Sequence, residues 1–111
     1  MTTMKDANAI QYKTVLILTK GASQKPDVKR RCEELKYKGN EQIEWVITPP
    51  DVPFTIKFKE ETGSPFEGKK FNNTNNISGP PIYDPGEKDR YYAYTLDVQG
   101  HIIDPGVIIW N

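Results

Sequence analysis

The stretch that decides the fold class is residues 91–110, YYAYTLDVQGHIIDPGVIIW. Every second residue over 92–98 is large and apolar, and a period of two is the pattern of a strand with one buried face. Gln99-Gly100 then predicts a hairpin turn, because glycine accepts the positive φ that such turns require. We expect residues 101–103 to return beside the first strand. The chain is then expected to bend at Asp104-Pro105-Gly106 and to form a last strand.

The same alternation predicts further strands at residues 12–19, 43–47 and 54–58. Pro49-Pro50 ends the second of these, because proline cannot donate to a sheet ladder. Several short strands separated by proline and glycine turns predict one all-β sandwich of Greek-key type. Its expected core is Val15, Ile17, Ile43, Trp45, Phe54, Ile56, Phe58, Tyr92, Tyr94, Leu96, Ile108 and Trp110.

Residues 26–37 allow two interpretations. Val28, Cys32 and Leu35 have the spacing of a helical stripe, which Ser23 is placed to cap. The alternation just before the turn-forming Lys38-Gly39-Asn40 is instead typical of a strand. We favour a loop or a single helical turn, followed by a strand over residues 35–38.

Residues 63–86 contain few aliphatic side chains and many asparagines, prolines and glycines. A run without regular structure of more than about 15 residues inside a compact domain indicates function or flexibility. We expect Phe66 and Phe71 to anchor this loop to the core, because an aromatic ring buries a large apolar area at one point.

Length and charge exclude several classes of protein. The chain has 111 residues, which predicts one domain over 12–111 after a disordered tail over 1–11. The 15 basic and 15 acidic side chains sum to zero charge, which argues against a nucleic-acid or anionic-membrane partner. The apolar run at residues 15–18 is too short for a secretion signal or a membrane span. Together with the single Cys32, this predicts a cytoplasmic protein.

His101 is the only imidazole in the chain, which restricts catalysis and metal binding. A nucleophile such as Cys32 would have to use it as a base, and no recognisable nucleophile elbow is present. A blue-copper site needs two histidines, and no glycine-rich phosphate loop occurs. We expect no enzyme, no catalytic residue, no metal and no cofactor.

Two chemical alternatives stay open. Asp97 and Asp104 flank the predicted hairpin, and a pair of carboxylates is what a glycosidase requires. Turn formation by Asp104 and a solvated face for Asp97 are the simpler interpretations. A divalent cation bound in the loop over residues 72–89 is the second alternative, although its spacing matches no calcium loop.

The candidate binding residues are aromatic or acidic and flank the predicted C-terminal strands: Tyr83, Tyr91, Asp89 and Trp110. Tyr91 lies on the opposite face of its strand from Tyr92, so we expect its ring to be free to stack on a sugar or on a proline of a peptide. The simpler alternative is that the Tyr-x-Tyr pattern fills the core and ties a crossing loop by a hydroxyl, as a tyrosine corner does.

The order of several short motifs resembles a known group of proteins. They are IEW (43–45), FTIKF (54–58), SPF (64–66), Phe71, Ser78-Gly79, YAYTLDV (92–98) and DPGVII (104–109). This series is similar to small bacterial β-sandwich proteins of the DP-EP type, related in shape to cupredoxins or immunoglobulin domains. The resemblance implies a cupredoxin-like or immunoglobulin-like sandwich without copper ligands, carries over no catalytic residue, and favours a strand near Tyr37.

These observations predict a small non-catalytic binding or protein-interaction module. The strand at residues 107–110 is apolar on both faces, so as an edge strand it would need cover. We therefore expect a homodimer or another protein partner at that C-terminal edge strand. The alternative function is a carbohydrate-binding or glycan-active domain that uses exposed tyrosine and acidic residues.

Overall fold

The structure, a computed structural model, describes residues 9–21 and 24–111. These residues form nine strands and no helix, so the predicted all-β sandwich is confirmed. Of the expected tail, residues 1–8 lie outside the described residues, as does Ser23. The strands are β1 (Gln11–Leu18), β2 (Asp27–Lys29), β3 (Cys32–Lys36), β4 (Glu41–Thr48), β5 (Phe54–Phe58), β6 (Lys70–Asn72), β7 (Arg90–Val98), β8 (His101–Ile103) and β9 (Gly106–Trp110).

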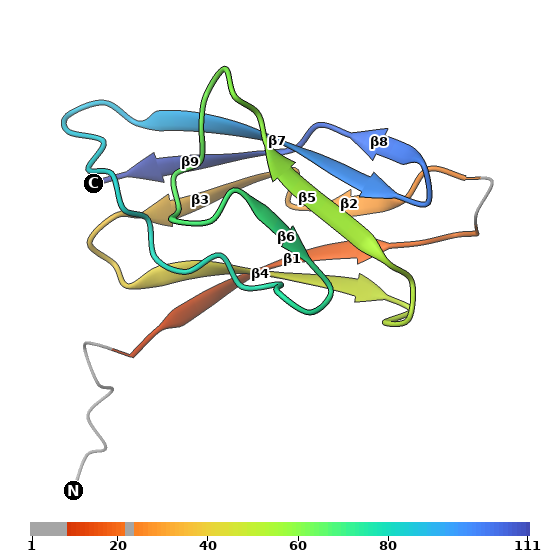
Figure 1. Ribbon diagram of the computed structural model, residues 1–111. Coiled ribbons are helices and arrows are strands. Elements are labelled where there is room, and N and C mark those ends of the chain that lie inside the picture. The colour runs from red at the N-terminus through yellow and green to blue at the C-terminus, as the bar shows by residue number, and fades with distance from the viewer. Residues whose placement is uncertain (1–8, 22–23) are drawn as a thin grey trace, which may run out of the picture.

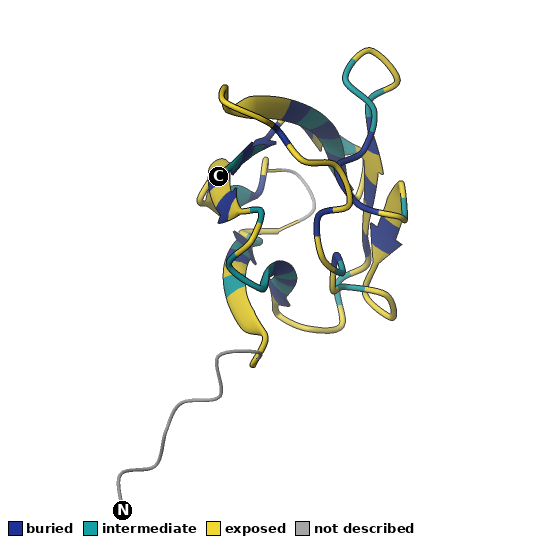
Figure 2. Cartoon of the chain, turned by 90° about the vertical axis from the view of Figure 1, so that its left-hand side faces the viewer, coloured by how far each residue is buried: buried dark blue, intermediate teal, exposed yellow. Residues whose placement is uncertain are grey.

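The strands form two sheets packed face to face (Figure 1). The smaller sheet has the order β2-β1-β4, and the larger has the order β3-β9-β7-β5-β6, with β8 beside β7. β1 runs parallel to β4 along its whole length, and β3 runs parallel to β9. Figure 2 shows the buried segments of both sheets enclosing the interior, while exposed residues are concentrated in the loops and on the outer faces.

The core follows from the two-residue alternation that the sequence shows. Ten of the twelve expected core residues are buried, the exceptions being Ile108 and Trp110. The Trp45 and Tyr94 rings, from opposite sheets, meet edge to face with centroids 5.7 Å apart. The Trp45 indole Nε1–H also donates to the Tyr94 hydroxyl at 3.2 Å. The Tyr-x-Tyr pattern thus fills the core, as the simpler interpretation expects. The expected tie to a crossing loop is wrong for Tyr94, because the partner of its hydroxyl is Trp45 of strand β4.

The predicted bend at residues 104–106 is wrong. β8 and β9 both pair with β7 in one continuous register, from Leu96 opposite Ile103 to Ala93 opposite Gly106. Pro105 interrupts the ladder because it has no N–H to donate. The chain therefore continues along β7 instead of turning away from it.

The predicted core positions Ile108 and Trp110 are also wrong. Both are only partly buried, whereas Val107 and Ile109 are fully buried. All four residues are apolar, so the pattern of hydrophobicity does not show which pair faces inward. The register decides it, because Val107 lies opposite the buried Tyr92 of β7 and shares its face.

β9 is not an edge strand, so the prediction of a C-terminal edge strand at residues 107–110 is also wrong. It lies between β3 and β7 and is paired on both sides. The cover that β9 requires is therefore supplied by the chain itself.

The region expected to contain a helical turn forms the strands β2 and β3 instead. The strand expected over residues 35–38 begins earlier, at Cys32, and ends at Lys36.

The long loop over residues 63–86 is well organised. Phe66 and Phe71 are buried, as expected, and β6 lies within the loop. The backbone N–H of Trp45 donates to the Asn76 carbonyl at 2.8 Å, and the backbone N–H of Ser78 donates to the Ile43 carbonyl at 2.9 Å. The loop thus covers the outer edge of β4, and we refer to this side of the sandwich as the closed flank.

Candidate functional site

The opposite side of the sandwich is shaped by a change of sheet at Arg30. β2 pairs with the second half of β1, with Leu16 opposite Lys29. Arg30 then adopts a φ of 69°, a left-handed conformation that non-glycine residues seldom take. Past this point the chain forms β3, which lies beside β9 (Figure 1). Within residues 9–21 and 24–111, no strand pairs with residues 11–15 on this side of β1.

A cleft of about 360 Å³ occupies the space left by this change of sheet. We call it the edge cleft, and we call this side of the sandwich the open flank. It brings together residues from β1, β3, β9, the start of β4 and the Arg30 crossing. Its lining residues are Tyr12, Lys13, Thr14, Arg30, Glu33, Glu34, Glu41 and Trp110.

Carboxylates cap the backbone donors on the β3 side of the edge cleft. The Glu34 N–H donates to Glu33 Oε1 at 3.0 Å, and the Lys36 N–H donates to Glu41 Oε1 at 2.9 Å. The Tyr37 N–H points the other way and donates to the Trp110 carbonyl. The edge N–H groups of Glu34 and Lys36 are thus satisfied by side chains, which opposes the pairing of a further strand with this part of β3.

The β1 side of the cleft has no such caps in the described part of the chain. The Gln11 N–H donates to the Asn40 carbonyl at 3.0 Å, and the Thr19 N–H donates to the Thr48 carbonyl at 3.0 Å. Odd-numbered residues of β1 therefore direct their backbone groups toward β4. Because these directions alternate along a strand, the N–H and C=O groups of Tyr12 and Thr14 face the cleft.

Two charged side chains form the floor of the edge cleft. Lys13 has the same parity as the buried Val15 of β1, and Glu33 has the same parity as the buried Leu35 of β3. Glu33 is 7% exposed and Lys13 is half-buried. Inward-pointing charges on edge strands oppose indiscriminate pairing with other strands. This floor therefore admits only an occupant that leaves both charges solvated or paired.

The four predicted binding residues gather at one end of the larger sheet. Tyr91 is 52% exposed and lies beside Ile108, while Trp110 lies two residues further along β9. Asp89 directly precedes β7 next to the end of β9, because Arg90 pairs with Ile109. Of the four, Trp110 alone lines the edge cleft.

Tyr83 is 57% exposed and is brought to the same end by its neighbour, Asp84. The Asn111 Nδ2 donates to the Asp84 carboxylate at 3.0 Å and to the Gly86 carbonyl at 2.8 Å. The Gly86 N–H and Asn111 hold the pKa of Asp84 below its usual value, with a smaller contribution from Lys38. This arrangement joins the 84–86 turn to the end of β9.

Each exposed ring on this face already has one side in contact with the chain. A Cβ added at Gly106 would fall onto the Tyr91 ring, so the ring covers the bare backbone of this glycine. The Lys36 Nζ lies 5.4 Å from the centroid of the Trp110 ring, within the range of a cation–π contact. A ligand on this face would have to stack on the outer side of Tyr91 or displace Lys36.

Both aspartates of the predicted carboxylate pair have partners within the chain. Asp97 accepts a hydrogen bond from the Gly100 N–H at 3.0 Å, and Asp104 pairs with Lys59 Nζ at 3.1 Å. The turn-forming aspartate is thus Asp97, so the expectation that Asp104 forms the turn and that Asp97 lies on a solvated face is wrong. No three His, Cys, Asp or Glu side chains are grouped as metal ligands in the described residues.

Cys32 is not an activated thiol. Partial desolvation, reinforced by the negative charges of Glu34 and Glu33, raises the pKa of Cys32 above its usual value. A raised pKa disfavours the thiolate, which is the nucleophilic form. Cys32 is paired with Gly106 at the start of β9, whereas His101 lies at the far end of β8, which precedes β9 along the same side of β7.

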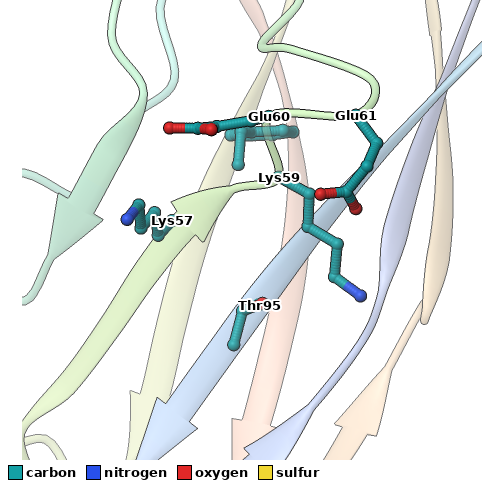
Figure 3. A pocket seen from close by; sticks show the side chains of 6 residues that line it. Lys57, Lys59, Glu60, Glu61 and Thr95 are labelled. Carbon is teal, nitrogen blue, oxygen red and sulfur yellow. The ribbon is translucent and has the colours of Figure 1, made fainter.

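A second hollow, of about 470 Å³, lies where β5 ends beside β7. Figure 3 shows Lys57 and Glu60 pointing to one side of it, while Lys59 and Glu61 lie on the other. The Lys59 ammonium is engaged by Asp104. These charges do not converge on one point, so the hollow is a weaker candidate than the edge cleft.

Most residues of the edge cleft were not predicted from the sequence to be binding residues. Tyr12, Lys13 and Arg30 come from strand ends and a crossing, where ordinary solvated side chains are expected. One feature of the sequence does distinguish Lys13 and Glu33. Each is a charged residue two positions before a buried apolar residue of the same strand, where a strand's alternation predicts an apolar side chain.

No protein-family model matches the chain, and no curated protein matches it. The described part of the chain contains no helix of the length and apolarity that crossing a membrane requires.

Proposed function

We propose that this chain is a non-catalytic protein-interaction module that binds its partner at the edge cleft. The observation that carries the proposal is the open half of β1, whose uncapped backbone faces a cleft lined by Tyr12 and Trp110. Aromatic side chains are enriched where proteins bind one another. The edges at β2 and β6 are only three residues long, and short edges are poor sites for pairing.

A display selection of random octapeptides against the immobilised chain tests this proposal. We expect selected peptides to lose at least tenfold in affinity when Tyr12→Ala is introduced. Ile102→Ala is the matched control, because Ile102 is as exposed as Tyr12 but lies on β8, away from the cleft. Peptides that lose affinity with Ile102→Ala or Tyr91→Ala, and not with Tyr12→Ala, would place binding elsewhere and contradict the proposal.

The second candidate function is carbohydrate binding on the outer face of β7 and β9. It is favoured by the exposed Tyr91 ring, which Gly106 supports from below and Ile108 and Trp110 flank. A thermal-shift screen over a panel of sugars tests it. A stabilising sugar whose effect disappears with Tyr91→Ala supports this function, and a flat response over the whole panel rejects it.

Two further attributes are proposed with the function. The lone Cys32 supports a reducing, cytoplasmic location, and the motif order supports kinship with the bacterial DP-EP-type proteins. A homodimer that forms outside the edge cleft is also proposed as a further partner contact. Light scattering coupled to size-exclusion chromatography tests it, and a strict monomer at high micromolar concentration would reject it.

A further inference from the structure

We infer that the occupant of the edge cleft is an extended peptide segment of another protein, which adds to β1 as a strand in line with β2. This inference rests on the proposed function and specifies its partner. Strand addition joins an extended peptide to an exposed sheet edge through main-chain hydrogen bonds. The open half of β1 is such an edge within the described residues.

The position of the peptide follows from the register of β2. Lys29 is paired with Leu16, so a strand continuing straight past Lys29 would next meet Thr14 and Tyr12. Arg30, with its positive φ, takes the chain away at this point. The vacant edge over residues 11–15 accepts four or five extended residues, at about 3.3 Å per residue. The incoming strand thus lies beside residues 11–15 of β1, where the chain would lie if β2 continued in the same sheet and did not cross to β9 as β3.

A second copy of the chain is a poor occupant of the same edge. Two copies related by a twofold axis use the whole open edge only if residues 11–15 pair antiparallel about their centre, which sets Lys13 directly opposite its counterpart. Like charges directly opposite one another destabilise a sheet pair. A different chain avoids this contact, so we assign the cleft to a heterologous segment.

The floor of the cleft specifies the side chains of the peptide. Alternate side chains of an added strand point inward, where they meet Lys13 and the nearly buried Glu33. An acidic or basic side chain there would be repelled by one of the two, and a large apolar one would desolvate both. We therefore expect small, uncharged polar residues at the inward positions. The outward positions contact the rings at the rim, Tyr12 and Trp110.

The test uses the octapeptides selected as described above, resynthesised with single N-methyl groups on the backbone. N-methylation of the residues whose N–H faces β1 is expected to lower affinity at least tenfold. N-methylation of the intervening residues is expected to change affinity less than threefold. A uniform response along the peptide would overturn the inference and leave the proposed function standing if Tyr12→Ala still weakens binding.

A matched pair of variants tests the same point on the protein. Thr14→Pro removes the edge N–H, and proline is tolerated where that group faces away from a sheet. Thr14→Ala removes the side chain and keeps the N–H. We expect the first variant to bind at least tenfold more weakly than the second, at equal melting temperatures.

If Thr14→Pro melts much lower than the parent, the N-methylated peptides on the parent chain decide the question. Equal binding by Thr14→Pro and Thr14→Ala would overturn the inference. A dimer of the parent chain that Thr14→Pro dissociates would also overturn it, in favour of self-pairing. Failure of every octapeptide to bind would reject both the inference and the proposed function.

Discussion

The two flanks of this sandwich are built from the same kinds of strand and end in opposite ways. On the closed flank, the loop over residues 73–78 bonds to the edge of β4 and places a buried serine hydroxyl, Ser78 Oγ, 2.8 Å from the Ile43 N–H. On the open flank, carboxylates cap the edge of β3, and residues 11–15 of β1 have no paired strand among the described residues on the side away from β4. An edge can thus be protected by main chain or by charge.

The comparison of the two flanks indicates which side of this small domain stabilises the fold and which side is available for binding. The closed flank joins buried rings to buried hydrogen bonds, so changes there should unfold the chain. The open flank holds polar, solvated side chains, so changes there should spare the fold and alter binding. Surface substitutions away from caps and buried groups usually shift stability by no more than about 0.5 kcal/mol.

The largest effect is expected from Phe71→Ala on the closed flank. The Phe71 ring is 4.9 Å from the Trp45 ring, centroid to centroid, and also contacts Phe58 and Phe66. Removing a buried phenylalanine ring costs about 3–5 kcal/mol of unfolding free energy. Urea unfolding measures the loss, with Tyr12→Ala as the control. Equal losses from the two variants would break the contrast between the flanks.

Ser78→Ala is expected to have an intermediate effect. The substitution removes the acceptor of the buried Ile43 N–H, and an unsatisfied buried donor costs about 1–3 kcal/mol. Thr14→Ala, a hydroxyl loss on the open flank, should change the unfolding free energy by no more than about 0.5 kcal/mol. Chemical denaturation of both variants compares them. A larger loss of unfolding free energy with Thr14→Ala than with Ser78→Ala would show that the open flank, too, stabilises the fold.

The buried Tyr94 hydroxyl predicts a loss of stability at alkaline pH. Burial raises the pKa of Tyr94, although the Trp45 hydrogen bond opposes this and the charge of Glu33 adds to it. A group whose pKa is raised by folding stabilises the fold fully below its unfolded pKa, about 10 for tyrosine. This contribution is lost as pH rises through the higher folded value.

Melting temperatures measured across the alkaline range test this. Tyr94→Phe should be less stable at neutral pH, because Trp45 loses its acceptor, and should show a shallower decline above pH of about 10. Tyr83→Phe, at an exposed tyrosine, serves as the control and should follow the parent. Parallel curves for Tyr94→Phe and the parent would contradict the prediction.

The smallest effect is expected at the exposed link between Asp84 and Asn111. Asn111→Ala removes one of the two main donors that lower the pKa of Asp84, so that pKa should rise toward its usual value. Carboxyl carbon shifts followed by NMR through acid titration measure it. Lys38→Ala should raise the pKa of Asp84 less, since the charge of Lys38 is the weakest contributor. A greater rise with Lys38→Ala would reverse the assignment.

Much of the fold was predictable from local pattern. Residues 54–58 and 92–98 carry one apolar side chain in every two, and one face of each strand is indeed buried. The hairpin at Gln99-Gly100 has φ values of 53° and 84°, as a two-residue turn of this kind requires. Phe66 and Phe71 could be predicted as core anchors because they are aromatic residues within a segment rich in asparagine, proline and glycine.

The candidate site was predictable only in part. Trp110 was found as an exposed aromatic residue, but the cleft that it lines depends on Tyr12, Arg30 and Glu41, which are far apart in the chain. Nothing local to Arg30 distinguishes a change of sheet from an ordinary loop. The pairing of β3 with β9 joins segments some 75 residues apart and carries no local signature.

Alternation of apolar and polar side chains was enough to determine strands, their buried faces and a two-sheet class, because a strand's two faces differ in solvation residue by residue. Where both faces are apolar, as at residues 107–110, that rule is silent, and the register against Tyr92 decided which side is core. Tertiary structure alone decided which edges are covered, since edge pairing depends on main-chain groups that every residue carries. The open flank is therefore a property of the folded chain.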